Sequence, residues 1–237
     1  MFHEHLANRS NLIALQGEYS IPLVTLSIIF ACLASYTAIS LNQRVKHNSF
    51  FHKNFWFVLA SIAMGFGIWT MHYIGLFAFS LPVEAHYNVV VTIISIIPGM
   101  LASFFVFYMA NRPKISLSLN IVTSIIMGLG VSAMHYIGLS SIETIAVHSH
   151  KEVLYVISIC ISFLGFFIFN MLQKYMERQS VRILTGLAMG LSVAGMHYIS
   201  MFSMTFYVDK STDILSKPLH LVNVNLLAFI VIVGIVV

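Results

Sequence analysis

The chain has 237 residues, of which 59% are hydrophobic and only 8% are charged. A soluble domain carries roughly 25% charged residues, so this chain has too little polar surface to face water as a globule. Its net charge of +4 does not point to nucleic acid, because the basic residues lie in short loops between apolar runs. Those runs are about 20 residues long, enough to cross a bilayer of roughly 30 Å. The composition therefore predicts an all-α polytopic membrane bundle, since a barrel would show short alternating segments.

Residues 1–19 precede the first apolar run and lack the basic region and adjoining apolar core of a signal peptide. We expect them to form an extracytoplasmic segment, followed by a seven-helix membrane domain over 20–237. The pair Pro98–Gly99 is expected to kink the third helix, which membrane helices tolerate. Apolar runs between polar breaks predict the helices at 20–41, 54–80, 88–110, 118–141, 153–173, 181–207 and 219–237.

The loops between these helices alternate in charge. The loops on one side hold eight basic residues, namely Arg44, Lys46, Lys53, Arg112, Lys114, Lys174, Arg178 and Arg182. The other side, with the N-terminus, holds four and most of the acidic residues. The positive-inside rule therefore predicts an outside N-terminus and a cytoplasmic C-terminus. The sequence ends in the apolar run "FIVIVGIVV", which fits either a truncated chain or a short natural terminus.

Two cysteines, Cys32 and Cys160, lie inside apolar runs. Their spacing makes no metal motif. We expect both to be small core residues and not to form a disulfide.

A Met-His-Tyr-Ile sequence occurs three times, on alternate predicted helices. The copies begin at Met71, Met134 and Met196, so they are 63 and 62 residues apart, with two helices in each interval. Two crossings restore the chain direction, so we expect parallel repeats about an axis along the membrane normal, after one extra N-terminal helix. The histidines are expected at a similar depth, ~10–15 Å below the outer edge of their helices. The expected repeat copies are about 54–115, 118–178 and 181–237.

The similarity between the copies extends upstream of the motif. The segments "MGFGIWTMHYIG", "MGLGVSAMHYIG" and "MGLSVAGMHYIS" align without gaps. Each Met-Gly pair precedes its Met-His pair by seven residues, nearly two helical turns, so the glycine and the histidine share a face. Small residues on such a face let membrane helices approach closely. We therefore predict that the imidazole rings point into the bundle and not at lipid.

These three in-register copies resemble the MHYT family of bacterial membrane sensor domains, and the similarity covers nearly the whole chain. The resemblance implies a sensor in the bacterial inner membrane that binds copper and responds to oxygen, carbon monoxide or nitric oxide. Family members often carry cytoplasmic diguanylate cyclase or phosphodiesterase domains after the seventh helix. No such output domain is present in this sequence, so no enzymatic activity is expected of it.

The chain departs from the family pattern at two points. The fourth motif position is isoleucine in every copy instead of threonine, and the third copy ends in Ser200 where the others have glycine. Neither of the changed positions is a candidate metal ligand.

Methionine and histidine offer uncharged donors, and these suit copper, with the thioether favouring Cu(I). A hard cation is poorly served, because no carboxylate lies at this depth in the motif helices. Zinc bound by three histidines is a chemical alternative. Adjacent methionine and histidine side chains diverge by about 100° on a helix, so a site must combine several helices. The predicted metal ligands are His72, His135 and His197 with Met71, Met134 and Met196 close by, and Met64, Met127 and Met189 as a second tier.

The same residues also have structural interpretations. A histidine in a membrane helix often hydrogen-bonds to a neighbouring helix, and duplication copies structural residues as faithfully as ligands. Against this, three ionisable residues at one depth in the membrane favour function. Methionine commonly fills gaps between helices. We expect Tyr73, Tyr136 and Tyr198 to pack or hydrogen-bond and not to bind metal.

Most of the other histidines fall in segments predicted to lie outside. Such a rim could collect metal, or it could be ordinary solvated surface. These residues are His3, His5, His86, His148, His150 and His220.

The function expected from these features is a membrane sensory domain that binds copper and senses a diatomic gas or redox state. Its expected partners are the bilayer, a gas ligand and a cytoplasmic signalling domain or protein. A copper-binding or copper-handling transporter or chaperone is the alternative, although no polar path crosses the predicted inner half of the bundle. A membrane oxidase ranks third, because the chain shows no haem or flavin motif.

Overall fold

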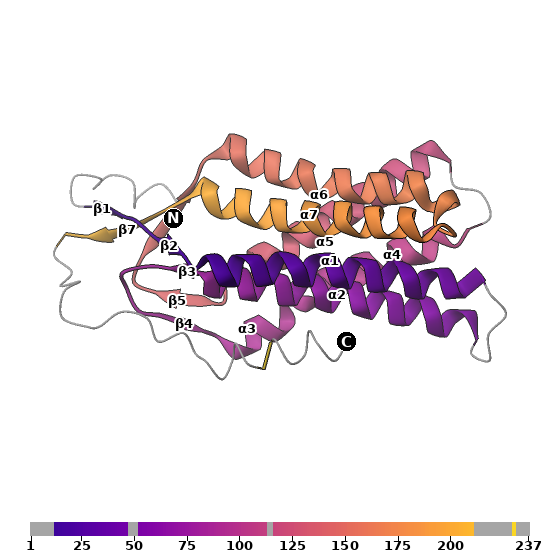
Figure 1. The fold of residues 1–237 in the computed structure, drawn as a ribbon. Helices are drawn as coiled ribbons and strands as arrows, with labels where there is room; N and C mark the ends of the chain where they lie inside the picture. Colours follow the sequence, from indigo (N-terminus) through magenta and orange to yellow (C-terminus); the bar gives the residue numbers. More distant parts are fainter. Residues whose placement is uncertain (1–11, 47–51, 113–115, 211–228, 231–237) are drawn as a thin grey trace.

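The computed structural model describes residues 12–46, 52–112, 116–210 and 229–230. Within these residues, six helical segments are long and apolar enough to cross a membrane. Figure 1 shows them side by side along one long axis, with the strands gathered at one end. The predicted seventh span, 219–237, lies outside the described residues apart from 229–230. The helices are α1 (Ile21–Gln43), α2 (Lys53–Ala78), α3 (Val89–Ile94), α4 (Ile96–Ala110), α5 (Leu117–Leu139), α6 (Glu152–Leu172) and α7 (Gln179–Ser203), with 3-10 turns at Arg44–Lys46 and Gln173–Tyr175.

The helices form a closed ring. The most extensive contacts link α1 to α2, α2 to α4, α4 to α5, α5 to α6, α6 to α7, and α7 back to α1. The three helices that carry the Met-His-Tyr motifs, α2, α5 and α7, therefore alternate with α1, α4 and α6. The motif helices also contact one another, and they are more buried than the others. This order brings three segments far apart in the sequence to one common centre.

The third span is broken, as the Pro98–Gly99 pair predicts. Helix α3 ends at Ile94 and α4 begins at Ile96, with Ser95 between them in a turn. Proline has no backbone N–H, so Pro98 cannot donate to the carbonyl of Ile94, four residues earlier. The helix is therefore interrupted at Ser95, one residue after that carbonyl.

Glycines let the motif helices pack closely on their neighbours. A Cβ built on Gly190 of α7 would lie 2.5 Å from the Cα of Cys32 on α1. A Cβ built on Gly65 of α2 would lie 2.9 Å from the Cα of Met100 on α4. Both distances are too short for a real side chain. The small residues upstream of the motifs thus set the spacing between helices, as expected for membrane helices.

Short strands cover the end of the bundle at which the three motif helices stop, and we call this the strand end. The predicted helix over 181–207 is wrong at its end, because α7 stops at Ser203 and a strand begins at Met204. That segment, "MTFYVD", is rich in β-forming residues and its burial alternates, which is typical of a strand. The predicted ends at 80 and 141 also overran α2 and α5. The strands are β1 (Leu12–Leu15), β2 (Glu18–Tyr19), β3 (Phe79–Ser80), β4 (Ala85–Tyr87), β5 (Ile142–Thr144), β6 (Val147–His150) and β7 (Met204–Asp209).

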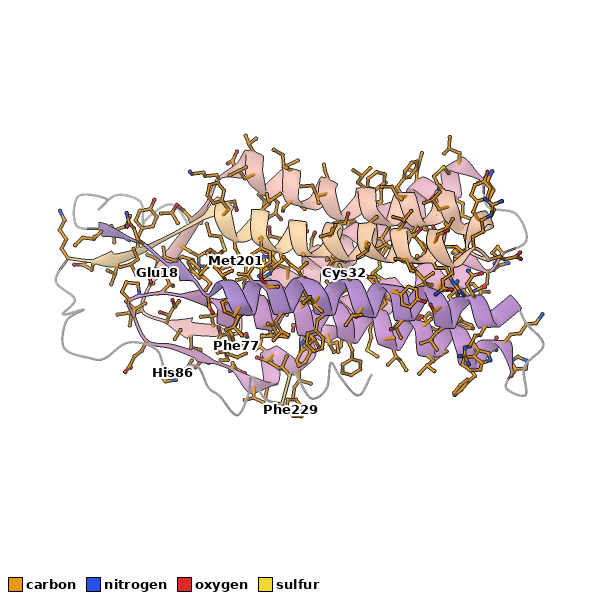
Figure 2. All side chains as sticks on the ribbon, viewed as in Figure 1. Glu18, Cys32, Phe77, His86, Met201 and Phe229 are labelled. Carbon is orange, nitrogen blue, oxygen red and sulfur yellow. The ribbon has the colours of Figure 1, made fainter. Side chains whose placement is uncertain are left out.

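The strands pair into small antiparallel sheets. A three-stranded sheet has the order β1-β7-β6, while β2 pairs with β3 and β4 with β5. Strands β3 and β7 continue directly from α2 and α7. Figure 2 shows Phe77 of α2 and Met201 of α7 where the helices meet this end, with Glu18 on β2 beyond them. The sheets therefore tie the ends of helices from different parts of the chain together.

Candidate metal centre

Three histidines from three helices meet inside the bundle, close to the strand end. His72 lies on α2, His135 on α5 and His197 on α7, and each side chain is 0% exposed. Their Nδ1 atoms form a triangle with sides of 3.1 Å (His72 to His135), 3.2 Å (His135 to His197) and 3.2 Å (His72 to His197). One ligand atom from each of the three, all within 4.8 Å of one another, gives a group that could hold a metal ion among the described residues. We call it the histidine triad.

The three imidazole rings meet edge to face. Their centroids are 4.9 to 5.2 Å apart and their planes are inclined at 79° to 88°. The point equidistant from the three Nδ1 atoms lies about 1.8 Å from each, close to the ~2.0–2.1 Å bond between imidazole and zinc. Hydrogen bonds alone explain this convergence poorly, because a proton on one Nδ1 can point at only one of its two neighbours. The donor set fits a three-coordinate metal ion after a small outward shift of the rings.

The triad is shallower than predicted. His72 and His197 each lie six residues before the last residue of their helix, and His135 lies four before the end of α5. At 1.5 Å per residue these separations are ~6–9 Å. The expected ~10–15 Å assumed helices that continue further than they do. The expectation that the three share a similar depth agrees with the structure.

The outer nitrogen, Nε2, of each imidazole faces the end of the motif on another motif helix. The Nε2 atom of His72 lies where a Cβ on Gly138 would be, and the Nε2 of His197 lies where a Cβ on Gly75 would be. Glycine at the end of the first two motifs therefore makes room for a ring from a neighbouring helix. Within the described residues, the Nε2 of His72 has no hydrogen-bond partner.

The third copy has a serine at this position, and the serine hydrogen-bonds to the remaining ring. Ser200 Oγ lies 2.9 Å from His135 Nε2 and 2.8 Å from the hydroxyl of Tyr136. When Nε2 of His135 carries the proton, it donates to Ser200 and leaves the Nδ1 lone pair facing the centre of the triad. A hydrogen bond to the outer nitrogen is how proteins orient histidine ligands of metals. The departure at Ser200 thus breaks the threefold equivalence of the histidines.

The MHYT family model, described as a bacterial signalling protein N-terminal repeat, matches residues 65–122 and again 128–186. The chain belongs to the MHYT family. These two matches contain the first two motifs, and the resemblance predicted from the sequence is confirmed. With six membrane-length helices among the described residues, the MHYT chain is a membrane sensory signalling domain.

Three curated relatives are similar to most of the MHYT chain. They are the cyclic di-GMP phosphodiesterase NbdA of Pseudomonas aeruginosa (30% identical over 202 residues), the signalling protein YkoW of Bacillus subtilis (29% over 200) and the bifunctional diguanylate cyclase/cyclic di-GMP phosphodiesterase MucR of P. aeruginosa (30% over 195). These alignments cover 83%, 81% and 80% of the chain but only 26%, 25% and 28% of the relatives. The MHYT chain therefore spans about a quarter of their length. No solved structure matches it.

The tyrosines of the MHYT motifs bond to serines on neighbouring helices. Tyr198 OH lies 2.5 Å from Ser27 Oγ on α1, and Tyr73 OH lies 3.1 Å from Ser95 Oγ between α3 and α4. Each of these serines donates its own proton to the carbonyl three residues earlier, at 2.8 and 2.7 Å, so its oxygen is free to accept. These tyrosines therefore link helices.

Tyr136 follows the same pattern and adds a link to the triad. Its hydroxyl lies near Ser158 on α6, which donates to the carbonyl three residues earlier at 2.7 Å. The hydroxyl of Tyr136 hydrogen-bonds to Ser200. Sequence reasoning missed the serine partners. A signal was present, because Ser95 and Ser158 are 63 residues apart, the same separation as Tyr73 and Tyr136.

The candidate methionines are buried on the same helices as the histidines, and two of them, Met127 and Met134, contact α4. A Cβ built on Gly99 of α4 would lie 3.7 Å from Met134 Cγ, and Ser103 of α4 donates to Met127 Sδ at 3.8 Å. Both side chains thus extend toward α4, as the ~100° between successive helical residues requires. Methionine ligation remains a prediction. The exposed fractions are 0% for Met71, Met134, Met196, Met127 and Met189, and 1% for Met64.

The remaining candidates lie outside the triad. Cys32 and Cys160 are free thiols, but the prediction that both are core residues was wrong, because Cys32 is half-buried and Cys160 is exposed. Among the histidines predicted to form an outer rim, Figure 2 shows His86 on β4 at the strand end, and His148 and His150 lie on β6. His3, His5 and His220 fall outside the described residues.

Proposed function

We propose that this membrane signalling domain holds one copper ion between His72, His135 and His197 and senses a diatomic gas, such as oxygen, carbon monoxide or nitric oxide, or the redox state. The observation that carries the proposal is the Nδ1 triangle, whose sides do not exceed 3.2 Å. Three helices that are distant in sequence each contribute one nitrogen to it. A metal ion bound by these three nitrogens would connect all three motif helices.

The donor chemistry favours a soft or borderline ion. Imidazole binds as a neutral ligand and suits copper, zinc and iron, while Mg²⁺ and Ca²⁺ require oxygen donors. No carboxylate belongs to the converging group among the described residues. If a methionine sulfur also reaches the ion, it would shift the preference further toward Cu(I). Zinc is the alternative that the metal analysis below distinguishes.

The residues around the triad have separate roles in this proposal. Burial keeps bulk water from the metal. Gly75 and Gly138 make room for two of the rings, and Ser200 orients the third. When bound, cuprous copper held by three nitrogens offers an open position for a small gas molecule that dissolves in lipid. Because each ring belongs to a different helix, a change in the ring positions would move α2, α5 and α7 relative to one another.

The signal would then pass to a cytoplasmic partner. We infer from the loop charges that the strand end faces outward in the bacterial inner membrane, with the C-terminus in the cytoplasm. Relatives named for cyclic di-GMP turnover are about three times as long as this chain. We therefore assign the membrane region a sensory role and infer that a cyclic di-GMP enzyme is its target.

Metal analysis of the detergent-purified chain tests this proposal. The wild type, loaded with Cu(I), is compared with His72→Ala, His135→Ala and His197→Ala, and with His86→Ala as a matched control on exposed β4. Each triad variant is expected to lose the copper that the triad holds, while the control keeps it. The loaded wild type should also show an infrared band of bound carbon monoxide that the triad variants lack. Equal copper in the wild type and the triad variants would contradict the proposal.

A further inference from the structure

A second group of soft donors lies on the sheet at the strand end. His148 and His150 are two residues apart on β6, so both side chains project from one face of the strand. The register of β6 on β7 places His148 opposite Phe206 and His150 opposite Met204. Side chains directly opposite in an antiparallel pair have Cβ atoms about 4.5–5.5 Å apart on the same face. Two imidazoles and one thioether therefore share one face of the sheet.

Contacts between the rings support this arrangement. The ring centroids of His148 and His150 are 5.3 Å apart, and the His148 ring lies 6.0 Å from that of Phe206. His148 is exposed, His150 is half-buried and Met204 is buried. The Nδ1 atom of His150 is buried and has no hydrogen-bond partner within the described part of the chain. A buried nitrogen without a partner is costly, unless water or a ligand satisfies it.

This group is connected to the triad by direct contacts. The His150 ring lies 5.9 Å from the ring of Tyr136. The Tyr136 hydroxyl bonds to Ser200, which bonds to His135 Nε2. Exposure falls along this series from His148 at the surface to His135 at the centre.

We propose that His148, His150 and Met204 form a capture site for a soft monovalent cation, Cu(I), and that this site loads the histidine triad. The donors are two neutral imidazoles and a thioether, which select Cu(I) over hard cations. Transfer requires only ligand exchange, in which a bond to His150 is replaced by a bond to His135. The copper oxidation state and the number of protons do not change. Capture of Cu(I) at this site does not depend on the triad, whereas its role in loading the triad rests on the proposed function.

The test measures how much Cu(I) the full detergent-purified chain binds when no other metal is added. Binding is followed under reducing conditions by competition with a coloured Cu(I) chelator. We expect two Cu(I) per wild-type chain and one in the His148→Ala/His150→Ala double variant. Loading of the triad in that variant is expected to slow about tenfold or more, with unchanged final occupancy. Met204→Leu, which preserves side-chain volume, should weaken the outer site and leave the sheet intact. His86→Ala is the matched control, because it removes an exposed histidine from a different sheet.

The same experiment separates failure of this inference from failure of the proposed function. If the triad does not bind copper, the wild type should hold one Cu(I) that the double variant loses and that His135→Ala retains. If the inference is wrong, the double variant and Met204→Leu will match the wild type in both stoichiometry and loading rate. A sharp thermal transition in each variant, monitored by tryptophan fluorescence, shows that the fold survives the substitutions.

Discussion

His135 Nε2 lies 2.9 Å from Ser200 Oγ, whereas the corresponding nitrogens of His72 and His197 face glycine. Ser200 is therefore the residue at this motif position that can fix a ring by a hydrogen bond from its side chain, since Gly75 and Gly138 have none. Removing the partner of a buried polar group costs about 1–3 kcal/mol. The loss of a bond that orients a metal-binding histidine typically weakens metal affinity 10–100-fold.

Ser200→Ala is accordingly expected to weaken Cu(I) binding at the triad about tenfold and to lower the thermal stability of the chain. Chelator competition and thermal unfolding in detergent measure the two effects. Ser140→Ala is the matched control, since Ser140 is exposed and its hydroxyl bonds to the carbonyl of Ile137 on α5. Wild-type affinity in Ser200→Ala would show that His135 needs no such partner.

Gly138→Ala is expected to disrupt the triad by steric overlap. The added methyl group would occupy the position of His72 Nε2, so this ring must leave the centre. Overpacking of a buried site costs about 1–3 kcal/mol, and copper occupancy after loading should fall in parallel. The control is Gly99→Ala, whose methyl group would meet Met134 at an ordinary 3.7 Å. If both variants load copper as the wild type does, the close packing of His72 on α5 has no functional role.

Tyr198→Phe is expected to cost about 0.5–1.5 kcal/mol of stability, the value of one hydrogen bond, without reducing copper occupancy. The reason is that Tyr198 OH bonds to Ser27 on α1 and not to the triad. Thermal unfolding and metal analysis of one preparation give both quantities. Tyr175→Phe, at an exposed ring beyond the opposite end of α6, serves as the control. A loss of copper in Tyr198→Phe would instead make this tyrosine part of the metal site.

The helices and the meeting of the histidines could be predicted from the sequence, because each depends on a strong local pattern. A run of about 20 apolar residues has few alternatives to a membrane helix, since its backbone must satisfy its own hydrogen bonds. The nearly equal spacing of His72, His135 and His197, on helices that run in the same direction, then places them at one level. The shared depth follows from the duplication alone.

The strands and the serine partners could not be predicted in the same way. β7 continues α7 without a polar break, so its apolar residues read as more helix until pairing with β1 and β6 is known. A serine such as Ser27 bonds to the carbonyl of Val24 within its own helix, which is ordinary for a membrane helix. Only the position of Tyr198 shows that this serine also joins two helices.

The sheet at the strand end is expected to weaken in acid. Partial desolvation by the surrounding protein lowers the pKa of His148, and burial together with the neighbouring His148 lowers the pKa of His150. Both rings are therefore neutral in the folded sheet at pH 7, and the unfolded strand takes up protons first as the pH falls below about 6.5. Stability is highest above that pH and declines as the pH falls through the lowered folded-state values.

Hydrogen exchange of β6 and β7 amides at pH 7.5 and pH 5, corrected for the intrinsic rates, checks this dependence. Protection should be lower at pH 5 in the wild type, and this change should be smaller in His148→Ala/His150→Ala. An equal loss of protection in both proteins would assign the acid sensitivity to other groups.

X-ray absorption at the copper K-edge tests the central claim most directly, since it reports the atoms bound to the metal. The chain should be loaded with one Cu(I) in the His148→Ala/His150→Ala background, so that the signal comes from the histidine triad alone. We predict a first shell with three nitrogen atoms and the multiple scattering of imidazole, reduced to at most two nitrogens by His197→Ala. A first shell dominated by sulfur, or one unchanged by His197→Ala, would contradict a copper site built from the three motif histidines.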